Sequence, residues 1–274
     1  MRFIDGILLG ILQGFTEFLP ISSSGHLVLL QELLNIKSPG VLVEVLLHLG
    51  TLLSIIIYFW KDMINILLEF VSIIKNKGRF SEVGLQENEY SILIKMVIIG
   101  SIPTALMGIL FESLFKKGYE NMYIVGIMLL ITGLLLWWGS KLSGRKTVKD
   151  ITVLDSIFIG FFQGLAINPG LSRSGSTIFA CLFRGIEKES AVKFSFILSL
   201  PAVFGAFLFE IKDIFTIGLG DINILACLLG IISAAISGYF AIKLLMKLLI
   251  DDRLHYFSYY CWIIGFLTIF LAFI

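Results

Sequence analysis

Long apolar runs dominate this sequence and restrict what it can fold into. A segment needs about 20 apolar residues to cross the roughly 30 Å of hydrocarbon in a bilayer. Six runs meet this requirement: residues 41–60, 92–112, 120–140, 190–211, 223–246 and 254–274. Charged residues make up only 15% of the chain, whereas an average soluble domain has about 25%. The chain is therefore expected to be an all-α polytopic membrane protein with six transmembrane helices.

Two further stretches, residues 3–34 and 152–184, are apolar at both ends but polar in the middle. The interruptions are rich in Pro, Gly and Ser and lie at residues 20–25 and 168–175. Each pattern predicts a helix, a loop at membrane depth and a returning helix, which together form a re-entrant hairpin. Backbone of this kind is tolerated in a membrane only where protein buries it or where it lines a cavity. Both loops should therefore be internal.

The two interrupted stretches match each other when the chain is shifted by 150 residues. The shift pairs Gln13-Gly14 with Gln163-Gly164, Ser22 with Ser172, Ser24 with Ser174 and Gly25 with Gly175. This match predicts a duplication within a single membrane domain, 1–274, with one repeat over about 1–140 and the other over about 151–274. Each half has one re-entrant hairpin and three spans. Because three is odd, the repeats should have inverted topology, so that the two hairpins meet near the membrane midplane.

The positions of the basic residues predict the orientation. Most of the 21 Lys and Arg residues fall on one side of the predicted spans, which the positive-inside rule makes cytoplasmic. The first hairpin then faces outward, and residues 61–91 form a cytoplasmic loop of unknown role. The N-terminus opens like a signal peptide, but no A-x-A-like site follows, so no cleavage is expected.

Composition disfavours two other classes of protein. The net charge of +1 gives no reason to expect a nucleic-acid partner. Cys181, Cys227 and Cys261 are odd in number and lack CxxC or Cys/His spacing, which argues against a disulfide framework and against a zinc site. They are interpreted as small lipid-facing or packing residues.

The first interruption follows a pair of polar residues within an apolar segment. Gln13 and Glu17 are four residues apart and therefore share one helix face. A carboxylate in an apolar segment is costly unless it is paired or functional. Glu17 is thus either a structural carboxylate bonded to the serines of the hairpin or, with Gln13, a metal ligand. Mg²⁺ or Ca²⁺ would suit such oxygen donors, with phosphate oxygens completing the coordination.

The turn from Ser22 to His26 combines hydroxyls, an imidazole and the free amides of a helix start. Such amides bind phosphate, so Ser22, Ser24 and Gly25 are candidate substrate-binding residues. Ser23 and His26 are candidates for the nucleophile or its general base, and the sequence does not choose between them. The alternative is that His26 is a hydrogen-bonded core residue.

The second interruption supplies the other half of such a site. Its candidate substrate-binding residues are Ser172, Ser174, Gly175, Ser176 and Thr177. Arg173 is the only Lys or Arg assigned to the membrane interior, and a guanidinium can bind phosphate through two hydrogen bonds. It could also be a structural partner of Glu17. In the first span, Glu44 and His48 share a helix face and either line the site or simply contact each other.

At these motifs the sequence resembles the bacterial undecaprenyl-diphosphatase family linked to bacitracin resistance. The first family motif has an acidic residue or Gln, three other residues and then Glu; it matches residues 13–17 and continues to His26. The second, PGxSRSGxT, matches residues 169–177. The resemblance covers essentially the whole chain.

The resemblance implies that the protein removes the terminal phosphate of a C55 isoprenoid diphosphate lipid and regenerates the carrier for cell-wall synthesis. It implies that Glu17 binds a divalent cation, Mg²⁺ or Ca²⁺, that Ser23 and His26 provide the nucleophile or its base, and that Arg173 clamps the diphosphate. The site would face the extracytoplasmic side of the bacterial cell membrane. Gln13 departs from relatives with a second Glu, which leaves metal affinity and stoichiometry open. The oligomeric state, a homodimer included, is also open.

Two functions other than an enzyme are compatible with parts of this pattern. A transporter or lipid flippase fits because inverted repeats with broken helices are also transporter architecture. The Ser/His nucleophile set favours the enzyme, since a phosphate carrier does not need it. A non-catalytic lipid-binding scaffold leaves the convergence of Arg, Glu and His unexplained.

Overall fold

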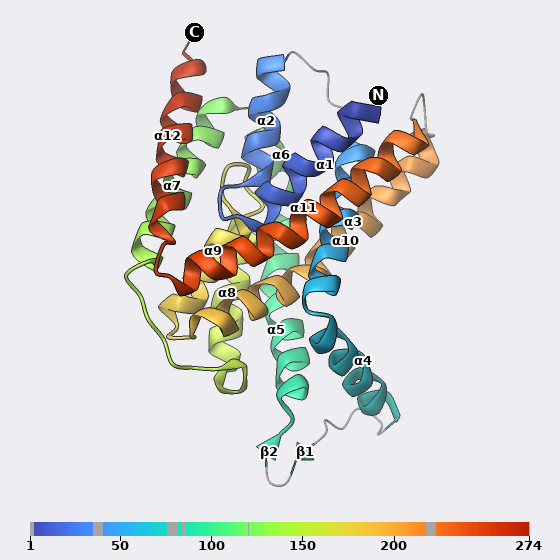
Figure 1. Ribbon diagram of the computed structural model, residues 1–274, viewed down its shortest axis with the longest axis vertical. Helices are drawn as coiled ribbons and strands as arrows, with labels where there is room; N and C mark the ends of the chain where they lie inside the picture. Colours follow the sequence, from blue (N-terminus) through green and yellow to red (C-terminus); the bar gives the residue numbers. More distant parts are fainter. Residues whose placement is uncertain are drawn as a thin grey trace.

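The computed structural model is almost entirely α-helical (Figure 1). It describes residues 3–34, 41–75, 82–83, 86–119, 121–217 and 223–273. The helices are α1 (Phe3–Phe18), α2 (Ser23–Leu34), α3 (Val41–Tyr58), α4 (Trp60–Lys75), α5 (Glu89–Leu110), α6 (Glu112–Tyr119), α7 (Met122–Gly139), α8 (Val153–Leu165), α9 (Arg173–Phe183), α10 (Lys188–Ile217), α11 (Ile224–Ile250) and α12 (His255–Leu271). A short 3-10 helix, η1 (Val148–Asp150), precedes α8, and the strands β1 (Glu82–Val83) and β2 (Gln86–Glu87) pair antiparallel before α5.

The apolar helices confirm a polytopic membrane protein. By length and composition, α5, α7, α10 over Lys188–Leu208 and α11 can each cross a membrane. The segments Leu46–Tyr58 and Trp60–Lys75 pass the same criterion only as a pair, which is bent by 89°. The apolar helix α12 has 17 residues and is slightly shorter. A helix therefore overlaps each predicted run, while the number of six spans stays a prediction.

The prediction of a loop over residues 61–91 is wrong for most of that range. Helix α4 covers its first half and the strands follow, because the polar residues that suggested a loop lie on one face of a helix packed against α5. Ser91 Oγ in α5 donates to Glu69 Oε1 in α4 at 2.5 Å, and Asn88 Nδ2 donates to Glu69 Oε2 at 3.1 Å. Glu69 is buried by this contact. The mixed composition of the segment thus reflects an amphipathic helix.

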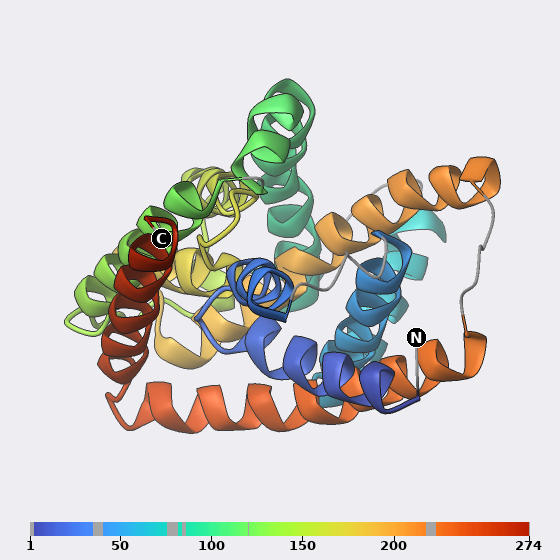
Figure 2. The ribbon, with the colours of Figure 1, turned by 90° about the horizontal axis from the view of Figure 1, so that it is seen from above.

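Glycines bring the first helix of each half close to a long helix of the other half. Figure 2 shows α1 running alongside α11. A Cβ added at Gly14 of α1 would collide with Ser237 Oγ of α11. In the second half, a Cβ at Gly160 of α8 would collide with the carbonyl oxygen of Gly100 in α5. Small residues allow membrane helices to approach closely without a hydrophobic driving force, so α11 and α5 fix the positions of the two hairpins.

Both hairpins share one hydrophobic core. It includes Phe18 at the end of α1, Ile178 in α9 and Phe196 in α10, and the rings of Phe18 and Phe196 lie 5.2 Å apart edge to face. All three cysteines are buried and unpaired, which agrees with a packing role rather than a lipid-facing one.

Candidate active site

The first loop reverses the chain between α1 and α2 at Ser22. This serine has a φ of 70°, in the left-handed region that non-glycine residues rarely adopt. Its Oγ accepts a hydrogen bond from the Gly25 amide at 3.2 Å and lies 3.2 Å from Ser24 Oγ. Ser22 therefore caps α2 and leaves the first turn of that helix next to α1.

The second loop ends in the same arrangement. Ser172 caps α9, its Oγ accepts from the Gly175 amide at 3.1 Å, and it lies 3.3 Å from Ser174 Oγ. Thr132 of α7 fastens this loop: its Oγ1 accepts from the Ser172 amide and donates to the Gly170 carbonyl, both at 3.0 Å. The Ser and Gly pairs that the 150-residue shift aligned thus make equivalent hydrogen bonds, whereas Gln163, the counterpart of Gln13, donates to Thr104 and to the Leu198 carbonyl.

Each helix start also touches the loop of the other hairpin. A Cβ added at Gly25 would lie 3.2 Å from Gly170 Cα, and one at Gly175 would lie 3.3 Å from Pro20 Cβ. Pro20 and Gly170 are themselves 150 residues apart. The N-termini of α2 and α9 consequently lie together, as the sequence predicted for a single site.

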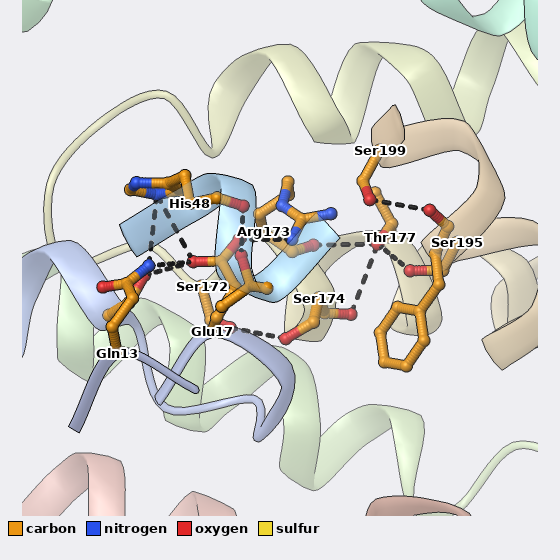
Figure 3. A network of polar contacts seen from close by, with 12 residues as sticks. Gln13, Glu17, His48, Ser172, Arg173, Ser174, Thr177, Ser195 and Ser199 are labelled. Atoms are coloured by element: carbon orange, nitrogen blue, oxygen red, sulfur yellow. Dashed lines mark hydrogen bonds and ion pairs between the residues drawn. The ribbon is translucent and has the colours of Figure 1, made fainter. Parts of the chain in front are cut away.

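Glu17 lies at the centre of this site and contacts both hairpins (Figure 3). Its Oε1 is 2.5 Å from Arg173 Nη2. Its Oε2 accepts from Ser23 Oγ at 2.8 Å and from Gln13 Nε2 at 3.1 Å. The structure therefore brings together Gln13, Glu17, Ser23 and Arg173, four residues selected from the sequence for metal binding or catalysis.

His48 of α3 reaches the same carboxylate. Its Nε2 lies 3.6 Å from Glu17 Oε2 and 3.2 Å from Gln13 Nε2 (Figure 3). The side chain is half-buried. From the sequence, His48 either lines the site or contacts Glu44. The side chain of Glu44 lies outside the described residues. Its place beside Gln13 and Glu17 makes it a member of the site that was not assigned from sequence.

Two polar atoms of the site are buried without a hydrogen-bond partner in the described part of the chain. They are Arg173 Nη1 and Gln13 Oε1. A buried donor or acceptor without a partner costs about 1–3 kcal/mol. One edge of the Arg173 guanidinium is thus occupied by Glu17, while Nη1 is a buried donor that an anion would satisfy.

His26 has partners other than Ser23. Its Nδ1 lies 2.8 Å from the Ser22 carbonyl oxygen, and its Nε2 lies 2.7 Å from the Tyr260 hydroxyl of α12. The two rings stack nearly parallel, at 6°. Because a carbonyl only accepts, Nδ1 carries the proton and Nε2 accepts from Tyr260. No sequence signal connected Tyr260 with the first hairpin.

The last residue of the second motif, Thr177, bonds to α10 and not to Glu17. Thr177 Oγ1 lies 2.5 Å from Ser195 Oγ of α10 and donates to the Arg173 carbonyl at 2.8 Å, as the right side of Figure 3 shows. Ser176 Oγ is buried and has no partner among the described residues. Thr177 therefore fastens α9 to α10, which fixes the helix that carries Arg173.

The donor set fits a divalent cation. In the described residues no group of three or more His, Cys, Asp and Glu side chains could hold a metal alone. The Glu17 carboxylate and the unpartnered Oε1 of Gln13 are nevertheless hard oxygen donors, and Mg²⁺ is commonly held by one or two protein ligands with substrate phosphates and water completing its shell.

Comparison with known proteins places this architecture in a family. The family described as bacitracin resistance protein BacA matches residues 6–267. The chain belongs to the BacA family. Similar proteins named undecaprenyl-diphosphatase occur in Alkaliphilus metalliredigens (44% identical, covering 98% of both chains) and in Halothermothrix orenii (44% identical, covering 99% of both). A third, from Methanobrevibacter smithii, is 44% identical over 97% of this chain and 96% of its own. The BacA family match includes both hairpins and the whole site.

Proposed function

We propose that this chain is an integral membrane phosphatase that hydrolyses undecaprenyl diphosphate to undecaprenyl phosphate and inorganic phosphate. It would thereby recycle the lipid carrier for cell-wall synthesis and confer bacitracin resistance. The names of the BacA-family relatives support this substrate. The observation that carries the proposal is Arg173, the first residue of α9: its Nη2 binds Glu17, which also bonds Ser23, and its Nη1 is a buried donor without a partner among the described residues.

Binding would begin at Arg173 and at the first turns of α2 and α9. The N-H groups and the dipole at a helix start favour phosphate oxygens, and the guanidinium adds charge-assisted hydrogen bonds. As Arg173 turns toward the diphosphate, its bond to Glu17 weakens. The substrate thus releases the carboxylate that holds Ser23 Oγ at 2.8 Å.

The reaction would then proceed through Ser23. Its Oγ attacks the terminal phosphorus, the bond from that phosphorus to the bridging oxygen breaks, and undecaprenyl phosphate leaves. The serine proton passes to Glu17, and a loose phosphoryl-transfer transition state requires little of this base. Water next attacks the phosphoserine, the serine oxygen recovers the proton from Glu17, and phosphate departs. His26 acts as a positioning residue, since its Nδ1 holds the carbonyl of Ser22 next to the nucleophile.

Glu17 and Gln13 would hold the divalent cation, Mg²⁺ or Ca²⁺. When bound, the cation neutralises charge on the diphosphate. Ser22, Ser24, Ser172 and Ser174 serve the site through the two capped turns that aim backbone amides at the phosphates.

The membrane arrangement is also part of the proposal. We infer six spans, two re-entrant hairpins and inverted repeats with the site near the extracytoplasmic side. The equivalent caps at Ser22 and Ser172 support this, as does the packing of α1 on α11 and of α8 on α5. In intact cells, a membrane-impermeant thiol reagent should label Lys117→Cys but not Arg145→Cys; the reverse pattern would invert the topology. The homodimer stays a prediction, which sedimentation of the detergent-solubilised protein would check.

The activity is tested by phosphate release from undecaprenyl diphosphate by the purified protein in detergent, with Mg²⁺ or with EDTA. Release by wild type that requires the cation and is lost in folded Glu17→Ala and Arg173→Ala variants is expected. Absence of release from well-folded wild type would instead favour a lipid carrier.

A further inference from the structure

The contact between Gln13 and His48 places a nitrogen donor at the proposed cation site. Gln13 Nε2 lies 3.2 Å from His48 Nε2. With the amide in this orientation its NH₂ group donates, so His48 Nε2 accepts and the ring proton lies on Nδ1. The lone pair of His48 Nε2 therefore points at Gln13 and Glu17, in the orientation that a metal ligand requires.

The distances among these three groups match the face of a coordination polyhedron. Gln13 Nε2, Glu17 Oε2 and His48 Nε2 form a triangle with sides of 3.1, 3.2 and 3.6 Å. Ligands bound about 2.1 Å from a cation lie about 3.0 Å apart in octahedral geometry and about 3.4 Å apart in tetrahedral geometry. A half turn of the Gln13 amide would exchange its two terminal atoms and bring Oε1 to this corner.

A need for this half turn on cation binding accounts for Gln13 Oε1, which is buried without a partner in the part of the chain that the structure describes. Without a cation, the turned amide would set its oxygen against the carboxylate and the imidazole lone pair, so the NH₂ group takes the inner place. With a cation between them, all three lone pairs would be satisfied. Glu17 Oε2 has a second lone pair for Ser23.

We propose that His48 Nε2, Glu17 Oε2 and Gln13 Oε1 form one face of a divalent-cation site that prefers a first-row transition-metal ion to Ca²⁺. The inference rests on the proposed function in that the diphosphate supplies the remaining ligands. Ca²⁺ takes six to eight oxygen ligands at about 2.3–2.6 Å, which this compact triangle does not offer. Imidazole nitrogen instead suits first-row transition metals such as Zn²⁺, Fe²⁺ and Ni²⁺, and Mn²⁺ serves as the paramagnetic probe of the site.

Close helix packing holds the three ligands in place. Helices α1 and α3 both pack on α11. Helix α3, which contains His48, packs on α11 at Gly50, where an added Cβ would collide with the carbonyl oxygen of Ile231. Helix α1, which contains Gln13 and Glu17, packs on α11 at Gly14. The triangle is therefore built between two helices that rest on a third.

The test is Mn²⁺ binding to the purified full-length protein, followed by electron paramagnetic resonance. Pulsed measurements detect the coupling of the bound ion to a directly coordinated nitrogen. The chain has 3 His residues, so His26→Gln, His48→Gln and His255→Gln identify that nitrogen one at a time. We expect the coupling in wild type, its loss only in His48→Gln, and a loss of Mn²⁺ affinity on the order of tenfold or more in that variant. His255 is the matched control, because it lies at the start of α12 and bonds the Asp252 carbonyl.

Three results would overturn the inference: Mn²⁺ bound to wild type without nitrogen coupling, coupling that survives in His48→Gln, or no binding at millimolar Mn²⁺. Phosphate release is measured on the same preparations. Nitrogen-coupled Mn²⁺ in a protein that does not release phosphate would support the His48 site while refuting the phosphatase.

Discussion

Arg173 and Glu17, 156 positions apart in the sequence, form an ion pair with Nη2 and Oε1 2.5 Å apart. Their side chains are only 17% and 6% exposed, and each comes from a different hairpin. Removing one partner of a buried pair is costly, by about 3–5 kcal/mol, because the other charge is left without compensation. The pair therefore joins the two halves at the point where the diphosphate would bind, and substrate must compete for the guanidinium.

Two substitutions of Arg173 should distinguish the contribution of its charge to kcat/KM from that of its planar guanidinium. Arg173→Lys keeps the charge but lacks the planar guanidinium that can bind a phosphate through two hydrogen bonds. The loss of one charge-assisted hydrogen bond, about 1.5–3 kcal/mol, predicts a decrease in kcat/KM of roughly 10- to 100-fold. Arg173→Ala should lose on the order of 10³-fold or more. Phosphate release at saturating Mg²⁺ measures both.

The double variant Glu17→Gln/Arg173→Ala provides the control for folding. It removes both charges, so its melting temperature in detergent should lie above that of Arg173→Ala although it is equally inactive. Turnover near the wild-type rate in Arg173→Ala would contradict the clamp.

The hydrogen bond between Ser23 and Glu17 predicts a phosphoserine intermediate. Acid quenching of wild type during turnover of substrate labelled in its terminal phosphate should leave acid-stable label on Ser23, and Ser23→Ala should retain none. Phosphohistidine is labile to acid. Label that disappears in acid but survives in base would assign the nucleophile to His26 instead.

The sequence located the site well because its signals are local. Pro, Gly and Ser interrupt two apolar stretches, and such breaks must be internal in a membrane. The 150-residue shift then aligned Ser22 with Ser172 and Gly25 with Gly175, whose hydrogen bonds are equivalent in the structure. The same alignment of the two hairpins predicts that Glu17 and Arg173 can meet, as they do in the structure.

The side-chain contacts that the sequence does not predict depend on how helices far apart in the sequence face each other. Spacing along a chain shows which residues share a helix face, but not which neighbour that face meets. His26 therefore bonds Tyr260 rather than Ser23, and Thr177 bonds Ser195 of α10. The polar residues of α4, such as Glu69, resemble those of a loop in the sequence because they find their partners only when α5 is in place.

Glycine packing between α1 and α11 should determine stability. A Cβ at Gly14 would collide with Ser237 Oγ, whereas one at Gly205 meets nothing within 4 Å. Overpacking typically costs about 1–3 kcal/mol, and each kcal/mol lowers Tm by about 2–4 °C in a protein of this size. Gly14→Ala should thus melt several degrees lower in detergent, while the matched control Gly205→Ala melts at or slightly above wild type. Equal Tm values would show that the close contact is not needed.

The Tyr260 hydroxyl distinguishes the two roles considered for His26. It lies 2.7 Å from Nε2 and occupies the lone pair with which that nitrogen would attack phosphorus. If His26 is a positioning residue, Tyr260→Phe removes a hydrogen bond that orients the ring. A bond of about 1 kcal/mol then predicts a decrease in kcat of roughly fivefold with little change in Tm. Tyr259→Phe is the matched control, since the neighbouring ring is exposed and contacts His255 instead. An increase in kcat in Tyr260→Phe would mean that the hydroxyl restrains a nucleophilic His26, and would transfer the attacking role from Ser23.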